Sequence, residues 1–168
     1  MYAAPRVLVV EDEMIVSEDL VQGVRNLGYE ICGAVSRGKD AVQLVETNAP
    51  DLVLMDIELK GEMDGIEAAQ LIKARLCTPI IFLTSSADSE LAERAELSEP
   101  FSYLVKPFSE RELYVTIEMA LYRAKMERRL RESEQFNRFL VENSPLGILF
   151  TDHHGKIGYV NPAAGSIL

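Results

Sequence analysis

The sequence has few of the residues that mark secreted or membrane-spanning chains. It contains no tryptophan and two cysteines, Cys32 and Cys77, which are too few for a disulfide framework. Both stand beside apolar residues, so we predict that each is a buried core side chain rather than a redox group. No apolar run reaches the roughly 18 residues that a membrane span needs, and the first residues lack a signal-peptide layout. We therefore expect a cytoplasmic chain without a membrane span.

Basic residues are also scarce relative to acidic ones. The 168-residue chain has 27 acidic and 17 basic side chains, a formal net charge of −10. A protein that binds nucleic acid through its bulk charge needs a basic surface, so direct nucleic-acid binding is not expected. The acidic excess lies in residues 1–108, which carry 19 acids and 9 bases, whereas residues 109–168 carry 8 of each. This asymmetry predicts two units, and solubility is the simplest reason for the acidic one.

Short apolar runs alternate with amphipathic stretches through the acidic part. The runs that predict strands are 7–10, 31–35, 52–55, 80–83 and 103–105. The stretches that predict helices between them are 14–27, 38–47, 65–76 and 88–97. Continuous apolar strands are typical of parallel sheets that are buried on both faces. The alternation therefore predicts a doubly wound α/β fold.

A long helix and a short hairpin are predicted in the remainder. Ser109 and Glu112 form a capping box at the start of a helix over 109–143, whose apolar stripe thins beyond residue 124. Such a charged helix is either a connector or a coiled-coil strand that pairs with a second copy, and both readings stay open. Apolar runs around 152–155 then predict a hairpin, with His153 and His154 as turn residues rather than metal ligands.

Polar side chains follow four of the predicted strands. Glu11 and Asp12 follow the first, Asp56 the third, Thr84 the fourth and Lys106 the fifth. Functional residues gather at the carboxyl ends of parallel strands, so neighbouring strands would bring these groups to one edge. Each residue alone is weak evidence, because an acid after a strand is often a helix N-cap. The combination at four strand ends is far more specific.

This combination suits phosphoryl chemistry. Clustered carboxylates repel one another unless a cation balances them, and Mg²⁺ prefers oxygen ligands and keeps waters that a phosphoryl oxygen can replace. A carboxylate can attack phosphorus to form an aspartyl phosphate, and Asp56 is the best candidate because it ends the most apolar strand. Lys106 would balance its charge and then pair with the phosphoryl group, and Thr84 would donate a hydrogen bond.

With these residues the sequence resembles the receiver domain of two-component response regulators over about residues 5–124. The matching motifs are VLVVED, LVLMD, DG, FLTS and YLVKPF, at residues 7–12, 52–56, 64–65, 82–85 and 103–108. The resemblance implies a flavodoxin-like (βα)5 sandwich with parallel sheet order 2-1-3-4-5, here with an extended C-terminal helix. It also implies that a sensor histidine kinase or a phosphotransfer protein supplies the phosphoryl group.

The resemblance assigns roles to single residues. It implies Asp56 as the phosphoacceptor and a Mg²⁺ site made by Glu11, Asp12, Asp56 and the backbone carbonyl of Glu58. It implies that Thr84 and Lys106 stabilise the phosphoryl group. It also implies that Tyr103 is a switch aromatic, which fills the space that Thr84 leaves and so reshapes the face made by the fourth helix, the fifth strand and the fifth helix. The sequence departs from the family pattern in two places. Lys60 stands where many members have proline, in a loop that is one residue longer than the commonest form, and Ser85 stands where alanine is more usual.

The final residues resemble the beginning of a PAS sensor domain, through FLVENSPLGI at 139–148, a TD pair and YVNPA at 159–163. We expect a receiver over 1–124, a helical linker over 125–143 and a PAS fragment over 144–168, because about 25 residues are too few to close a core. The chain's own downstream PAS or output part would be its intramolecular partner, and a parent protein of this kind could end in a kinase or a cyclase. Residues 1–168 themselves are expected to be regulatory and not an enzyme.

Two other classes stay open at this point. A haloacid-dehalogenase-type phosphatase also forms an aspartyl phosphate, but it needs Asp-x-Asp after its first strand. In this sequence the candidate nucleophile follows the third strand, and the residue two positions on is Glu58. A phosphorylation-independent interaction module would lack an acid or the lysine, and neither is missing.

Overall fold

The computed structural model describes residues 3–75, 77–85 and 101–165. Within it the chain divides into two compact units, Met1–Ala124 and Lys125–Leu168. The first unit is built on one parallel sheet and the second on a short antiparallel hairpin.

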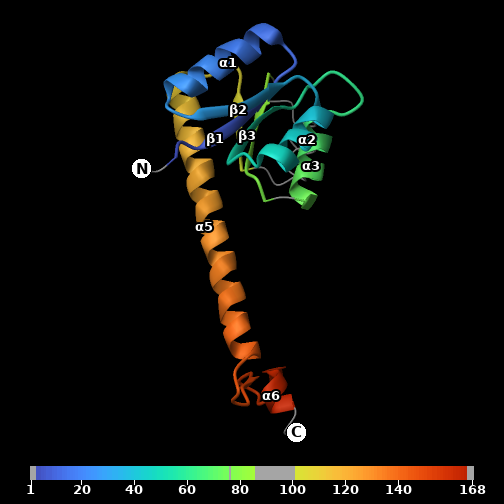
Figure 1. The fold of residues 1–168 in the computed structure, drawn as a ribbon, viewed down its shortest axis with the longest axis vertical. Helices are drawn as coiled ribbons and strands as arrows, with labels where there is room; N and C mark the ends of the chain where they lie inside the picture. The colour runs from blue at the N-terminus through green and yellow to red at the C-terminus, as the bar shows by residue number, and fades with distance from the viewer. Residues whose placement is uncertain (1–2, 76, 86–100, 166–168) are drawn as a thin grey trace. The chain divides into compact units, whose positions relative to one another are not determined.

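Five strands form the sheet of the first unit in the order β2-β1-β3-β4-β5. Figure 1 labels three of them, β1, β2 and β3. They are β1 (Arg6–Val10), β2 (Glu30–Val35), β3 (Leu52–Asp56), β4 (Ile80–Thr84) and β5 (Ser102–Val105). Every residue of β3 and β4 is buried, as their uninterrupted apolar sequences predict for strands covered on both faces. The predicted doubly wound α/β fold and its strand order are therefore confirmed.

Helices cover both faces of this sheet. They are α1 (Met14–Asn26), α2 (Gly38–Asn48), α3 (Gly65–Arg75) and α5 (Glu110–Glu142), whose first turns belong to this unit. Alternate residues of a strand point to opposite faces, so each strand feeds two separate cores. Leu8 and Met55 pack with α2 and α3, whereas Val9 and Leu54 pack with α1 and α5. The helix predicted over 88–97 lies outside the described residues.

Some side chains differ from the predicted burial. The sequence pattern puts Ile15 on the apolar face of α1, but its side chain is 75% exposed, because the buried face is set by Leu20 and Val24 and Ile15 lies on the far side of the helix. Cys77 is exposed because it lies in the connection between α3 and β4, outside both cores. The predicted burial of Cys77 is therefore wrong, whereas Cys32 is partly buried and packs against the α2–α3 core.

The predicted capping box begins α5. Glu112 N donates to Ser109 Oγ at 3.2 Å, and Ser109 N donates to Glu112 Oε2 at 2.7 Å. These hydrogen bonds satisfy amide donors that the first turn of a helix leaves without partners. The hydrogen bonds that the Ser109 amide and hydroxyl donate to Glu112 Oε2 lower the pKa of the Glu112 carboxyl below its ordinary value.

The second unit contains the predicted hairpin, β6 (Leu149–Thr151) and β7 (Ile157–Val160), followed by α6 (Pro162–Gly165). The rings of His153 and His154 lie against each other in the exposed turn, with centroids 3.9 Å apart. Asn161 is 1% exposed, and its amide group bonds four backbone groups, those of Val141, Leu146, Ile148 and Ala164. Among the described residues no helix is both long and apolar enough to cross a membrane.

Candidate metal centre

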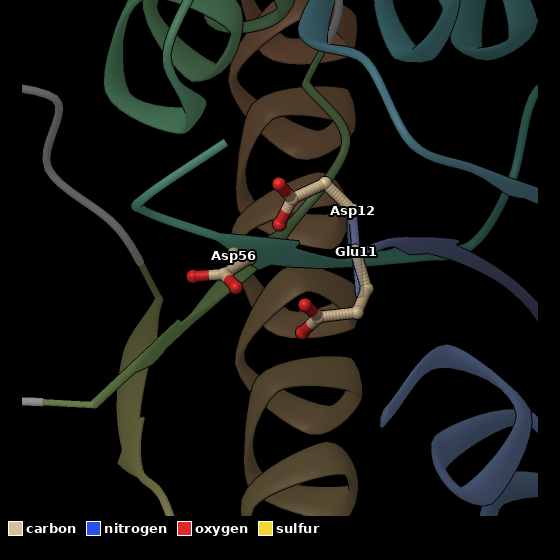
Figure 2. A group of neighbouring side chains, drawn as sticks. All are labelled: Glu11, Asp12 and Asp56. Atoms are coloured by element: carbon tan, nitrogen blue, oxygen red, sulfur yellow. The ribbon is translucent and has the colours of Figure 1, made fainter. Parts of the chain in front are cut away.

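Three carboxyl groups meet at the carboxyl ends of β1 and β3 (Figure 2). Glu11 and Asp12 follow β1, and Asp56 is the last residue of β3, the neighbouring strand. One oxygen from each lies within 4.8 Å of the others. Glu11 is 2% exposed and Asp56 is 6% exposed, so two of the three carboxyl groups are almost fully removed from water. Burial of this kind is costly for a carboxylate unless a cation compensates it.

Lys106 supplies one such cation. Its Nζ lies 2.5 Å from Glu11 Oε2 and 2.8 Å from Asp56 Oδ2. Lys106 directly follows β5, and its backbone amide donates to the Thr84 carbonyl at 2.8 Å, which fixes the lysine relative to β4. The sequence predicted that Lys106 would balance Asp56, and the structure brings the two groups together. The second contact, to Glu11, was not predicted.

The pKa values of Glu11 and Lys106 are both raised in this site. Burial raises the pKa of Glu11, and the charge of Asp56 adds to this, while the Lys106 hydrogen bond opposes it. Burial alone would lower the pKa of Lys106, but hydrogen bonds from its ammonium to Asp56 and Glu11 outweigh that effect and raise it. Lys106 is therefore held in its charged form.

The loop after β3 closes one side of the cluster. The backbone amide of Glu58 donates to Asp56 Oδ1 at 3.1 Å, and the Glu58 carboxylate accepts a hydrogen bond from Ser85 Oγ. Further along the loop, Lys60 Nζ lies 3.0 Å from Asp12 Oδ2, and this contact with the Asp12 carboxylate raises the pKa of Lys60. In the sequence, Lys60 and Ser85 were noted only as departures from the family pattern. Their contacts with Asp12 and Glu58 were not predicted.

Thr84 and Tyr103 lie on the adjoining strands. Thr84 ends β4 and is 6% exposed, one residue beyond Leu83, the register partner of Asp56. Tyr103 is half-buried on β5 and packs against Phe82, with ring centroids 5.9 Å apart. Both residues are at the strand positions that the sequence predicted.

Gly65 contributes through its lack of a side chain. A Cβ atom built on it would lie 1.9 Å from the Asp56 carbonyl oxygen, so no other residue fits at the start of α3 without moving that backbone. Its amide also donates to the Ile57 carbonyl at 3.1 Å. The Asp-Gly pair was visible in the sequence, but the close approach to Asp56 was not.

The donor set fits a hard divalent cation. Glu11, Asp12 and Asp56 offer only carboxylate oxygens, which Mg²⁺ prefers, and the part of the chain that the structure describes adds no histidine or cysteine to the cluster. The negative charge exceeds what Lys106 alone can balance. A cation at this position would therefore complete the charge balance of the site.

The fold and the cluster together define a class of protein. The parallel sheet in the order 2-1-3-4-5 is the fold of solved response regulator receiver domains, and in this chain three acids and a lysine meet at the carboxyl ends of its strands. Residues 7–118 match the family model described as "Response regulator receiver domain", and the chain belongs to this family.

Individual relatives agree with this assignment. The chain is 43% identical over 118 residues to the transcriptional regulatory protein PdtaR of Mycobacterium tuberculosis, a match that covers 70% of this chain and 57% of that protein. The chain thus spans little more than half the length of this curated relative. It is 35% identical over 136 residues to the regulatory protein AtoC of Escherichia coli, covering 80% of this chain and 29% of AtoC.

Solved receiver domains have the same fold. The signal receiver domain of a modulated diguanylate cyclase from Desulfovibrio desulfuricans is 40% identical, with a TM-score of 0.71, over 74% of this chain and 98% of that one. The N-terminal domain of a response regulator/sensory box/GGDEF 3-domain protein from Carboxydothermus hydrogenoformans is 30% identical, with a TM-score of 0.68, over 73% of this chain and 98% of that one.

Proposed function

We propose that the chain is the phosphoacceptor module of a two-component pathway and that Asp56 is the residue that accepts the phosphoryl group. The observation that carries this proposal is the position of Asp56, which shares a buried site with two other acids and with the ammonium of Lys106. A carboxylate in such a site has the cationic surroundings that phosphoryl transfer needs. The family membership supports this function over a dehalogenase-type phosphatase.

The proposed reaction is a direct transfer from a phosphohistidine of a kinase or phosphotransfer protein. An oxygen of Asp56 attacks the phosphorus atom, the new P–O bond forms as the P–N bond breaks, and the imidazole nitrogen keeps the electron pair. Mg²⁺, held by Glu11, Asp12, Asp56 and the Glu58 carbonyl, would supply positive charge to the phosphoryl oxygens. Lys106 then pairs with a phosphoryl oxygen.

The proposed switch follows from the added charge. The acyl phosphate carries roughly −1.5 to −2 charge units where the Asp56 carboxylate carried −1, and this extra negative charge draws Lys106 away from Glu11 and attracts the hydroxyl of Thr84. Tyr103 then fills the space that Thr84 leaves, and the face formed by β5, α5 and the predicted 88–97 helix changes shape. This is a shift between two existing states, and its size depends on how differently the phosphoryl group stabilises them.

The proposed output lies beyond the receiver. The receiver would regulate a PAS or other output module through α5, either as a connector or by pairing with α5 of a second copy. This organisation is supported by a solved domain of similar fold, which is the N-terminal domain of a response regulator/sensory box/GGDEF 3-domain protein. We also propose that the protein acts in the cytoplasm.

The test is a titration of the ¹⁵N-labelled chain with Mg²⁺ and beryllofluoride, a phosphoryl mimic, followed by amide NMR. We expect amide shifts around Asp56 and along β5 in the wild type and in Asp19→Asn, a matched control on an exposed position of α1. Asp56→Asn removes the acceptor carboxylate and is expected to abolish the response. A wild-type response in Asp56→Asn would contradict the proposal.

A further inference from the structure

Two lysines divide the three acids of the cluster between them. Lys106 contacts Glu11 and Asp56, whereas Lys60 Nζ lies 3.0 Å from Asp12 Oδ2. The Asp12 side chain is 9% exposed and that of Lys60 is 79% exposed. Asp12 is thus a nearly buried carboxylate whose counter-charge comes from a lysine that stands mostly in water.

We propose that Lys60 is a tethered counter-ion that competes with Mg²⁺ for Asp12 and so sets the Mg²⁺ concentration at which the site fills. The inference rests on the proposed function, because it takes the three acids as the metal ligands. An ammonium group and a divalent cation on the same carboxylate repel each other, so the Lys60–Asp12 ion pair opposes Mg²⁺ binding and weakens when the metal binds. An exposed ion pair is weak, which makes Lys60 a displaceable competitor rather than a permanent block.

The loop geometry presents Lys60 to Asp12. The start of the loop is fixed by the hydrogen bond from the Glu58 amide to Asp56 Oδ1, at 3.1 Å. Gly61 follows Lys60 with a φ of +132°, in the region that glycine adopts most easily. The turn therefore occurs directly after Lys60, while the segment before it stays attached to the phosphoacceptor strand.

The surroundings also leave Lys60 room to move away. Asp12 and Lys60 border an open groove of about 890 Å³ between the loop and the start of α2. Lys39 lines the same groove from α2, and no ion pair joins Lys39 to the three acids within the described parts of the chain. The groove has room for the displaced Lys60 side chain. Lys39 supplies a matched control, because replacing it removes a positive charge from the same groove without removing a contact to Asp12.

The test measures Mg²⁺ affinity by calorimetry at low ionic strength, where surface charges are least screened. Lys60→Gln, which removes the charge and keeps a polar side chain of similar size, is expected to bind Mg²⁺ about 1.4- to 5-fold more tightly than the wild type. Lys39→Gln is expected to change the affinity by less than about twofold, because no ion pair among the described residues joins Lys39 to the three acids. Lys60→Arg, which keeps the charge, should retain the wild-type affinity.

Urea unfolding of the same variants gives a second readout. Without Mg²⁺, Lys60→Gln should be slightly less stable than the wild type, because Asp12 loses its counter-charge. With saturating Mg²⁺ the variant should gain more stability than the wild type does, since binding to the folded state is linked to its stability.

The outcomes separate the inference from the proposed function. Unchanged or weaker Mg²⁺ binding in Lys60→Gln overturns the role of Lys60, and equal tightening in Lys39→Gln overturns it in favour of a general charge effect. If the wild type itself binds no Mg²⁺, the metal site of the proposed function fails, and this inference fails with it.

Discussion

The ammonium of Lys106 lies 2.8 Å from the carboxylate of Asp56, although the two residues end strands that are not neighbours in the sheet. The contact crosses the end of β4, which lies between them, and the same ammonium reaches Glu11 at the end of β1. One lysine thus connects three strand ends and compensates two buried acids. The fold brings the Lys106 ammonium and the two carboxylates together, and their attraction stabilises the buried site.

Replacing Lys106 should therefore destabilise the receiver. Lys106→Met leaves Glu11 and Asp56 buried without their shared cation, and we expect a loss of about 1–3 kcal/mol in the free energy of unfolding. Mg²⁺ should recover part of this loss because it supplies positive charge at the same acids. Urea unfolding with and without Mg²⁺ measures both effects, with Lys39→Met as the control. Equal stability of the two variants would contradict this account of the site.

Gly65 offers a steric test of how the Asp56 backbone is held. The Cβ of Gly65→Ala would lie 1.9 Å from the Asp56 carbonyl oxygen, so α3 or β3 must shift, at a cost of about 1–3 kcal/mol or more. At Gly23, in the middle of α1, the nearest atom to an added Cβ is 3.8 Å away. Gly23→Ala should therefore stabilise the domain by about 0.5–1 kcal/mol through helix propensity. Thermal unfolding compares the two variants, and a similar effect from both would show that the close approach is unimportant.

The contact between Tyr29 and Glu118 predicts an alkaline pH dependence. Tyr29 Oη donates to Glu118 Oε1 at 2.7 Å, and burial, together with this hydrogen bond, raises the pKa of Tyr29 above its ordinary value. A tyrosine whose pKa is raised by folding makes its full contribution to the free energy of unfolding below its pKa in the unfolded chain, which is about 10. That contribution is lost as the pH rises from there toward the pKa in the folded state. The free energy of unfolding should therefore fall above about pH 10 by more in the wild type than in Tyr29→Phe. Parallel pH profiles would contradict this prediction.

Asn161 should hold the second unit together. Its buried amide group bonds the Val141 and Leu146 carbonyls and the Ile148 and Ala164 amides. Asn161→Ala leaves these groups without their partner, at a cost of about 1–3 kcal/mol. Hydrogen exchange of the Ile148 and Ala164 amides should become faster, while Asn137→Ala, at an exposed position of α5, should leave it unchanged. Unchanged exchange in Asn161→Ala would contradict the bridging role.

Much of the fold could be predicted because its signal is local. The apolar run that forms β3 and the capping box at Ser109 follow from the side chains of adjacent residues, and the structure has both. The meeting of Glu11, Asp12 and Asp56 also followed, because strand ends in a parallel sheet share one edge.

Other features depend on geometry that a sequence pattern does not contain. The Lys60–Asp12 ion pair depends on the path of a lengthened loop, and the need for Gly65 depends on a backbone approach between two elements. Ile15 and Cys77 are exposed although their sequence neighbours are apolar. Apolar neighbours determine neither which side of a helix meets the core, as for Ile15, nor whether a connecting segment reaches the core, as for Cys77.

Peptide mapping by mass spectrometry identifies the residue that accepts the phosphoryl group, which we propose to be Asp56. The chain is incubated with Mg²⁺ and a small-molecule phosphodonor such as acetyl phosphate, and the acyl phosphate is trapped by borohydride reduction before digestion. We expect one modified residue, Asp56, in the wild type and no modification in Asp56→Asn. Modification of a different residue, or equal modification of Asp56→Asn, would contradict it.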